Sequence, residues 1–446
     1  MTRQALRTRL ITQSLTGSYR LFLVAGGFLA AVGAALFGYA LTSGQSDRAW
    51  HLFHANWLFF NGVMCGSIAL TAVHKIANAK WSGVVLRFSQ ATIFYAIVSL
   101  VGLVIIMTVG YEHIYGPMQA QLPTFTPGKQ LWLSHGFMFG RMFVGLATLL
   151  WLGWTLIKAD MVPDLSLVKG SASGPRRAVY DAMTAGFDTS VAGRAAHDAK
   201  IHRLAPMFVV TYALVMTIIA FDGIMALQPH WFSNLLGGFY FMGSFLAGHT
   251  ALALFLIYGR HQLGIADLVS AKQRHDLGKL CFGFTVFWAY LMWAQYLVIW
   301  YGNLPEETGF VFARLWGPWM PIGRAVFLGM FVIPFWGLLF VAAKKSPFTL
   351  GLFATVSLSS LWLERYLLVL PSVTKESGHM FGLPELGPTA MFLGLFLLCY
   401  WAFTRRFPMV SPRLAEITLA KESEHGDEFD HDERPVDYAH PKELEA

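Results

Sequence analysis

The chain has 446 residues, of which 55% are hydrophobic and only 13% are charged, and its mean hydropathy is +0.50. Because soluble domains carry about 25% charged residues, this composition excludes a soluble globular protein and indicates an integral membrane protein. The formal net charge of +7 follows from membrane topology, as argued below, and we expect no nucleic-acid partner.

Ten apolar runs reach the roughly 20 residues that a helix needs to cross a bilayer. The first run follows a polar N-terminal stretch that is too long for a cleaved secretory signal, so we expect it to be retained. The expected spans are 21–41, 52–72, 88–110, 131–157, 204–227, 235–259, 280–302, 323–343, 348–370 and 384–404.

An internal repeat suggests how these helices are grouped. Helix four contains Leu131–Gly145 and helix eight contains Leu315–Gly329, and each segment has an LW pair followed by a GR motif. Helices 2–5 (52–227) and 6–9 (235–370) could therefore be two four-helix bundles related by parallel duplication, with helices 1 and 10 flanking them. Coincidence in an apolar, glycine-rich chain is the alternative. We predict an all-α membrane domain over residues 1–410.

Lys and Arg residues define the orientation. If both termini share one side of the membrane, that side receives 26 Lys and Arg residues. The other side receives only Arg48, Lys129, Arg314 and Lys375. By the positive-inside rule, both termini are predicted to be cytoplasmic.

Two cytoplasmic segments complete the predicted organisation. The loop 158–203 contains an alanine-rich stretch, from which we expect a surface helix. Residues 411–446 form an acidic tail whose composition suits a solvated segment. This tail could order against a partner subunit or could serve only for solubility.

The apolar segment Thr211–Asn234 carries a single carboxylate, Asp222. An acidic side chain within a membrane span is costly, so it normally faces a bundle interior or a wet cavity. Asp222 is either a proton-handling group or a carboxylate paired for structure. The topology places it near the outer face at nearly the depth of His135, with Arg141 closer to mid-membrane.

Further polar residues collect in the outer half of the predicted spans. They are Asn56, Asn61, Gln295, Tyr296, Glu364 and Arg365, with Arg324 near the start of its helix. His249 lies in the cytoplasmic half, where we expect little else that is polar. An outer-half pocket therefore fits these residues better than a polar path across the whole membrane.

Several of these residues have a structural alternative. His135 could cap a helix or bond a backbone carbonyl. Arg141 and Glu364 could form an ion pair between helices. Arg365 could neutralise Glu364, and both Arg365 and Arg324 could extend to the membrane surface.

The sequence argues against a metal centre. Cys65, Cys281 and Cys399 are far apart, and no CxxC pair or Cys/His cluster is present. A bis-histidine haem requires two histidines at one depth, whereas His135 and His249 differ in depth. His51 and His54 are too shallow to pair with His249. We predict no haem and no metal.

A pocket in the outer half suits a hydrophobic substrate with a polar head, such as a quinol. Oxidation of a quinol releases two protons, which His or a desolvated Asp can accept. Asp222 and His135 are therefore the candidate catalytic residues. The candidate binding or proton-path residues are Arg141, Asn56, Asn61, Gln295, Tyr296, Arg324, Glu364, Arg365 and His249.

Three segments resemble a known family. They are Phe221–Asn234 (FDGIMALQPHWFSN), Phe287–Thr308 (FWAYLMWAQYLVIWYGNLPEET) and Glu364–Pro371 (ERYLLVLP). They resemble the NrfD/polysulfide-reductase-like membrane subunits, in particular the second such subunit of bacterial alternative complex III. The resemblance extends over essentially all ten helices.

This resemblance implies a membrane subunit of a quinol:cytochrome c, or similar acceptor, oxidoreductase in a bacterial inner (cytoplasmic) membrane. It implies two four-helix bundles, no cofactor held by the chain, and a quinone or menaquinone pocket near the periplasmic end of the first bundle. The implied partners are a sister NrfD-like subunit, periplasmic iron–sulfur and c-type haem subunits, lipid and a terminal oxidase.

Two other functions remain open at this stage. Quinol could be oxidised in the sister subunit, which would leave this chain as a scaffold or as part of a proton path. A secondary transporter also uses internal repeats, but its helices are broken near mid-membrane. The Pro and Gly breaks in this chain lie mostly at the predicted helix ends.

Overall fold

The computed structural model describes residues 8–12, 15, 19–79, 81–83, 85–374 and 381–413. Within these residues the chain is helical without strands, and ten helical stretches are long and apolar enough to cross a membrane. The predicted all-α fold with ten transmembrane helices is therefore confirmed. Lys375 and most of the acidic tail, residues 414–446, lie outside the described residues.

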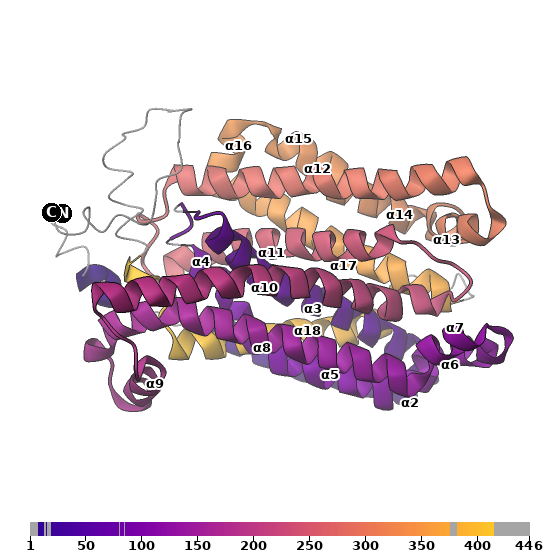
Figure 1. The fold of residues 1–446 in the computed structure, drawn as a ribbon. Helices are drawn as coiled ribbons and strands as arrows, with labels where there is room; N and C mark the ends of the chain where they lie inside the picture. The colour runs from indigo at the N-terminus through magenta and orange to yellow at the C-terminus, as the bar shows by residue number, and fades with distance from the viewer. Residues whose placement is uncertain are drawn as a thin grey trace.

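The ten spans are single helices or consecutive helical segments (Figure 1). They are α2 (Arg20–Thr42), α3 (Ser46–Ile76), α4 with α5 (Leu86–Gln90 and Ala96–Thr108), α8 (His135–Val168), α10 (Val191–Gly223), α11 (Leu235–Gln262), α12 (Ala271–Gly302), α14 with α15 (Met320–Phe327 and Ile333–Leu339), α17 (Pro347–Val373) and α18 (Leu383–Arg406). The connecting helices are α6 (Tyr111–Gln121), α7 (Pro127–Leu133), α9 (Gly174–Thr184), α13 (Pro305–Leu315) and α16 (Val341–Lys345).

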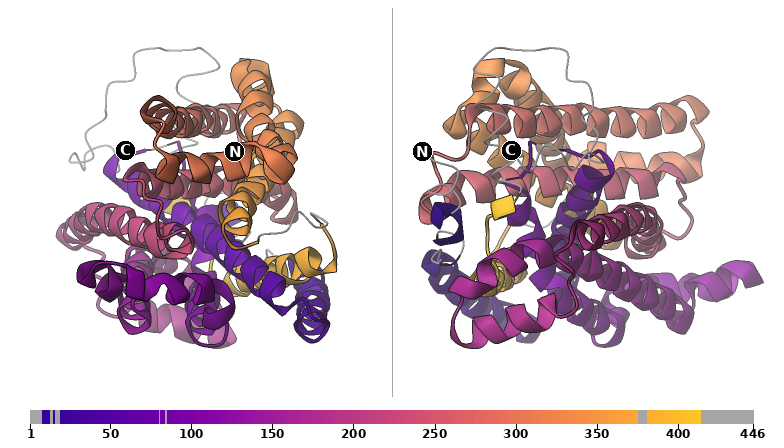
Figure 2. Two further views of the ribbon diagram at one scale, coloured as in Figure 1. Left: turned by 90° about the vertical axis from the view of Figure 1, so that its right-hand side faces the viewer. Right: turned by 60° about the vertical axis from the view of Figure 1, so that its left-hand side comes forward.

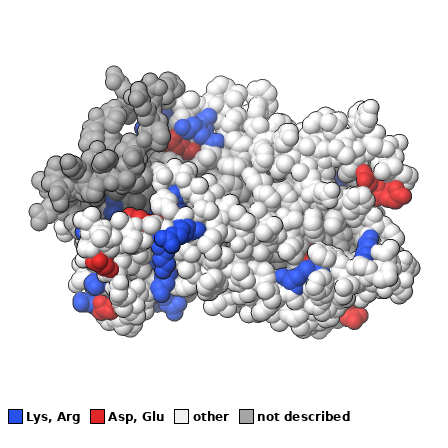
Figure 3. All heavy atoms as spheres, in the orientation of Figure 1, with Lys and Arg blue, Asp and Glu red and all other residues white. Residues whose placement is uncertain are grey.

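The long helices lie side by side and leave two ends (Figures 1 and 2). We call one the α9 end, where α8 ends and α10 begins. We call the other the α6 end, where α6 and α7 extend past the long helices. On the face shown in Figure 3, charged side chains gather toward the two ends, and the broad band between them is mostly uncharged. This distribution is what a bilayer requires of a protein that spans it.

Helix α3 lies at the centre of the fold. Of the residues in its apolar window, 94% are buried, against 11% for α2. It packs very closely on α11, because a Cβ added at Gly66 would lie 1.9 Å from the Ser244 carbonyl oxygen. Small residues allow membrane helices to approach in this way.

Helix α3 contacts α10 and also α11, α17 and α18. It therefore touches helices that the repeat assigned to both bundles, and the division into two four-helix bundles stays a prediction. Helices α2 and α18 form a separate close pair, in which a Cβ at Gly33 would lie 2.1 Å from the Met391 amide nitrogen.

Several helices are longer than the apolar runs that predicted them. Helix α8 continues to Val168 and α10 begins at Val191, so the connection between them is 169–190 rather than 158–203. Helix α8 continues because its two carboxylates in this stretch, Asp160 and Asp164, are paired with cations. Helix α12 begins at Ala271 rather than 280, because Ser270 and Gln273 form a capping box there.

One span is interrupted in the middle. Between α14 and α15, residues Leu328–Val332 form a π-helical turn. Pro334 follows directly and has no amide hydrogen to donate, which accounts for the irregular turn before it.

Candidate functional site

Asp222 and Arg141 form a buried ion pair near the α6 end. Arg141 Nε donates to Asp222 Oδ2 at 2.7 Å, and Arg141 Nη2 donates to Oδ1 at 2.6 Å. The Asp222 side chain is fully buried, and the Arg141 side chain is 10% exposed. Both carboxylate oxygens are therefore bonded to one guanidinium, in the two-pronged geometry that makes such pairs strong.

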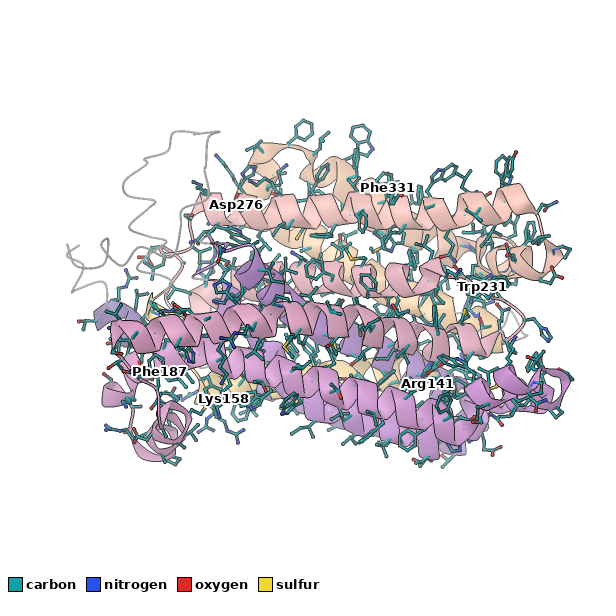
Figure 4. The ribbon with its side chains drawn as sticks, in the orientation of Figure 1. Arg141, Lys158, Phe187, Trp231, Asp276 and Phe331 are labelled. Carbon is teal, nitrogen blue, oxygen red and sulfur yellow. The ribbon has the colours of Figure 1, made fainter. Side chains whose placement is uncertain are left out.

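Arg141 also contacts the segment just before α8. Its Nη1 donates to the Trp132 carbonyl at 2.7 Å, and its Cζ lies 3.8 Å from the centre of the Trp132 ring. The Phe137 ring lies on the guanidinium as well, at 5.0 Å. The two rings cover the guanidinium on the outer side of the helix bundle. Figure 4 labels Arg141 on α8. The rings hold the cation by cation–π attraction, which strengthens when the cation is desolvated.

The backbone around Asp222 is fixed from two neighbouring helices. The Tyr115 hydroxyl, on α6, donates to the Asp222 carbonyl at 3.1 Å. Burial raises the pKa of Tyr115 well above its ordinary value, so this phenol stays protonated and remains a donor. His54 Nε2, on α3, donates to the Gly223 carbonyl at 2.6 Å. The C-terminal end of α10 is thus tied to α3 and α6.

His54 is a part of this site that the sequence argument missed. Its side chain is fully buried, and Nε2 donates to a carbonyl, so that in the neutral imidazole Nδ1 is the acceptor. This Nδ1 has no hydrogen-bond partner among the residues that the structure describes. His51, one turn away on the same face of α3, repeats the pattern, with Nε2 bonded to the His113 carbonyl at 3.0 Å and Nδ1 unpartnered. The i, i+3 spacing of the two histidines was the signal available in the sequence.

His135 is bonded to a backbone carbonyl, as in the structural alternative given above. It is exposed at the start of α8, its Nε2 bonds the Met107 carbonyl at 2.6 Å, and its ring stacks on Tyr111 at 3.9 Å. Within the described residues no hydrogen bond joins it to Asp222. The structure therefore brings Arg141 to Asp222, and it shows His135 bonded to a backbone carbonyl.

Asn56 and Asn61 are bonded in the interior of the bundle. Asn56 accepts from Trp362 Nε1 at 2.9 Å and donates to the Leu52 carbonyl at 2.9 Å. Asn61 Oδ1 accepts from the Ser99 hydroxyl at 2.7 Å. Both asparagines join helices around α3, and Asn56 satisfies its polar groups without a ligand.

Glu364 and Arg365 form a second buried pair, on α17. Arg365 Nη1 lies 2.7 Å from Glu364 Oε2, and Trp288 Nε1 donates to Glu364 Oε1 at 2.8 Å. The Arg365 guanidinium lies 4.4 Å from the Tyr240 ring centre. The proposed pairing of Arg141 with Glu364 is therefore wrong, because each of them has a nearer partner.

The remaining predicted residues do not join either pair. Gln295 and Tyr296 are half-buried on α12, and Arg324 is exposed on α14. His249 is buried on α11, where Nδ1 bonds the Phe245 carbonyl at 2.9 Å and the ring stacks on Phe284.

A buried ionic cluster at the α9 end was also missed. Arg87 Nη2 lies 2.5 Å from Asp164, Lys75 Nζ lies 2.5 Å from Asp160, and Gln90 Nε2 donates to Asp160 at 2.7 Å. The four charged residues of this cluster lie outside the predicted membrane spans, so the cluster does not test the expectation for the cytoplasmic half of those spans. The carboxylates lie beyond the apolar run that defined helix four, so they were assigned to a loop.

Among the described residues, no group of three or more His, Cys, Asp and Glu side chains is arranged to hold a metal ion. The chemistry that the Asp222 region offers is that of a carboxylate held by a guanidinium, with unprotonated imidazole nitrogens on the adjoining helix. Such groups can exchange protons with a bound molecule that carries hydroxyl groups. Neither a family model nor a curated protein sequence matches this chain.

Proposed function

We propose that this chain is a membrane subunit, without a redox centre of its own, of a quinol:cytochrome c or similar oxidoreductase. The proposal rests first on the resemblance of Phe221–Asn234, Phe287–Thr308 and Glu364–Pro371 to NrfD-like subunits. The single structural observation that carries it furthest is the Asp222–Arg141 pair. It is a buried carboxylate inside a membrane span, close to one end, where an unpartnered His54 nitrogen lies on the adjoining helix.

The orientation follows from the distribution of Lys and Arg. If the α9 end is cytoplasmic, the α6 end and the Asp222 region lie on the periplasmic side. The sister membrane subunit, the iron–sulfur and c-type haem subunits and a terminal oxidase are the proposed partners. The iron–sulfur and c-type haem subunits would receive the electrons, because they carry the redox centres of the proposed complex.

The proposed role of the site concerns the protons. Oxidation of a quinol to a quinone releases two electrons and two protons, and the protons need acceptors close to the hydroxyl groups. His54 Nδ1 is an unprotonated acceptor, and Asp222 becomes one when Arg141 moves away from it. Arg141 would then stabilise the negative charge on Asp222 again once the proton has left.

Substitution of Asp222 in the assembled complex tests this function. Asp222→Asn keeps the side-chain shape and removes the exchangeable charge, and we expect at least a tenfold loss of quinol turnover per assembled complex, about 1.4 kcal/mol in barrier. The matched control is Glu385→Gln, which removes a buried carboxylate that is paired with Arg48 at the same end. The control should keep normal turnover. Normal turnover and normal proton release in Asp222→Asn would contradict the proposal.

A second candidate function is a proton-conducting subunit whose quinol site lies in the sister subunit. The observation that favours it is a set of buried polar side chains along the whole of α3. They are His51, His54, Asn56, Asn61, Ser67, Thr71 and His74. From the sequence, polar groups were expected mainly in the outer half, with His249 in the cytoplasmic half.

The two functions separate at His74, which lies near the α9 end of α3. If protons cross along α3, His74→Leu should lower the number of protons moved per quinol oxidised in reconstituted vesicles and leave quinol affinity unchanged. If the chain only binds quinol near the α6 end, this substitution should leave both quantities unchanged.

A further inference from the structure

Three exposed cations on the adjoining helices α8 and α10 have no counter-ion among the described residues. Lys158 on α8 and Lys200 and Arg203 on α10 are all exposed. Within the described residues none of them forms an ion pair or a side-chain hydrogen bond. Three other exposed cations at this end are held locally: Arg177 by Asp181, Lys279 by Asp276, and Arg194 by the Thr189 carbonyl.

The packing of α8 against α10 places the three cations at one level. The helices run in opposite directions, and a Cβ at Gly153 would lie 3.1 Å from the Phe208 ring. Farther along, His197 Nε2 bonds the Ala159 carbonyl at 2.8 Å. Lys158 is therefore opposite the turn of α10 that carries Lys200 and Arg203. Figure 4 shows Lys158 toward the α9 end of α8 and Arg141 toward the α6 end.

An apolar surface begins next to the three cations, on the side toward mid-membrane. Trp151 is 65% exposed, and it lies two turns from Lys158 on the way to mid-membrane. On α10, Met207 is 54% exposed and Val210 is 60% exposed, one and two turns from Arg203. From Lys158 to His135 the helix covers about 35 Å at a rise of about 1.5 Å per residue. The cations thus lie at the edge of an apolar band about as thick as a bilayer core.

We propose that Lys158, Lys200 and Arg203 form a binding site for the headgroup of an anionic phospholipid. The phosphate would lie among the three cations, and an acyl chain would lie on Trp151 and Met207 along the surface between α8 and α10. The negative charge of the phosphate is complementary to the three cations. The acyl chain would cover the exposed apolar side chains that lie next to the cations toward mid-membrane. Basic residues at the ends of adjoining membrane helices are suited to anionic headgroups for this reason. The inference depends on membrane insertion and not on the proposed role in quinol oxidation.

Lipid titration of the full-length chain, in its complex where the partners co-purify, tests this site. The protein in detergent micelles is titrated with phosphatidylglycerol and, in parallel, with phosphatidylcholine. The site variant carries Lys158→Gln, Lys200→Gln and Arg203→Gln. The control variant carries Arg177→Gln, Arg194→Gln and Lys279→Gln, and it removes the same charge from the same end. We expect phosphatidylglycerol to bind the site variant about tenfold more weakly than the native chain, and the control variant within about twofold.

Two outcomes would overturn the proposal. Equal losses in the two variants would show that the lipid responds to the overall charge of this end. If glycerol phosphate binds the native chain as tightly as phosphatidylglycerol does, the acyl chain contributes nothing, and the site is one for a soluble anion.

A second measurement locates the acyl chain without depending on the charge variants. Phosphatidylglycerol with brominated chains should quench tryptophan fluorescence in the native chain more than in Trp151→Phe. Equal quenching in the two proteins would place the chain elsewhere and overturn the assignment. The three cations are exposed, so the site variant should keep the native thermal midpoint.

Discussion

Asp222 of α10 and Arg141 of α8 are joined by two hydrogen bonds, from Nε at 2.7 Å and from Nη2 at 2.6 Å. The two partners are unequally buried, because Asp222 is fully covered and the Arg141 side chain is 10% exposed. This asymmetry decides what happens when one partner is removed. Without Asp222, Arg141 can turn toward the membrane surface. Without Arg141, the Asp222 carboxylate has no route to water.

The first prediction compares the two single variants and the double variant. Arg141→Gln leaves a buried, uncompensated carboxylate, and we expect it to lower the free energy of unfolding by about 3 kcal/mol. Asp222→Asn should cost less, and Asp222→Asn with Arg141→Gln should be more stable than Arg141→Gln alone. Equilibrium unfolding in detergent micelles measures all three. Losses that simply add in the double variant would show that the two residues do not interact.

The second prediction concerns the close pair of α2 and α18. Gly33→Ala puts a Cβ 2.1 Å from the Met391 amide nitrogen, so the two backbones must separate. We expect a loss of about 2 kcal/mol, as for overpacking elsewhere. Gly27→Ala is the matched control, because a Cβ there would have no heavy atom within 4 Å. Thermal unfolding of both variants measures the difference, and equal midpoints would contradict the close approach.

The ten spans could be predicted because a bilayer demands about 20 apolar residues in a row, and composition alone reveals such runs. Helix ends could not be predicted as well. Asp160 and Asp164 continue α8 past its apolar run because Lys75 and Arg87 pair with them, and those partners are about 80 residues away in sequence. A run of apolar residues carries no information about such pairing.

The candidate site could be predicted only in part, because single residues are visible in the sequence and their pairing is not. Asp222 stands out in the sequence as a lone carboxylate in an apolar run, and Arg141 as a cation in another. Which cation faces which carboxylate depends on how helices pack, so the pairing of Arg141 with Asp222 rather than with Glu364 emerged only from the structure. His54 was considered only as a haem ligand. Its bond to the Gly223 carbonyl spans 169 positions.

The third prediction is a pH effect outside the membrane spans. Arg9 donates to Asp267 at 2.6 and 2.8 Å, and this contact lowers the pKa of Asp267 below its ordinary value of 3.8. A lowered carboxyl pKa stabilises the contact above the ordinary value, and this stabilisation is lost as the pH falls through the lowered pKa. We therefore expect the contact to persist at neutral pH and to weaken only below about pH 4.

The distance between spin labels at the exposed positions Thr12 and Gln262 measures this contact. It should be constant from neutral pH to about pH 4 and should lengthen below that. In Asp267→Asn the distance should not change with pH. Because the side chains of Arg9 and Asp267 are 34% and 57% exposed, the effect on overall stability should be small. If the distance in the native chain lengthens between pH 6 and 5, a group other than Asp267 must be titrating.

The last prediction concerns the buried cluster at the α9 end. Arg87 lies 2.5 Å from Asp164 and 3.9 Å from Asp160, and its Nη1 donates to Gln90 at 2.8 Å. Arg87→Met removes the cation nearest to Asp164, which then keeps the hydrogen bond from the Ser411 hydroxyl at 2.8 Å and the weaker attraction of Arg413. Asp164→Asn removes one anion and leaves Arg87 with Gln90 and Asp160.

Arg87→Met should therefore cost about 3–5 kcal/mol, as expected for a buried pair that loses one partner, and Asp164→Asn should cost clearly less. The exposed pair of Arg177 and Asp181 provides the control, because both side chains are about half exposed and Arg177→Met should cost less than about 0.5 kcal/mol. Unfolding midpoints and the yield of folded protein measure the three variants. If Arg87→Met is too unstable to purify, the stability losses of Asp164→Asn and Arg177→Met are compared with each other instead. A cost for Asp164→Asn no larger than that of Arg177→Met would show that this cluster does not stabilise the α9 end.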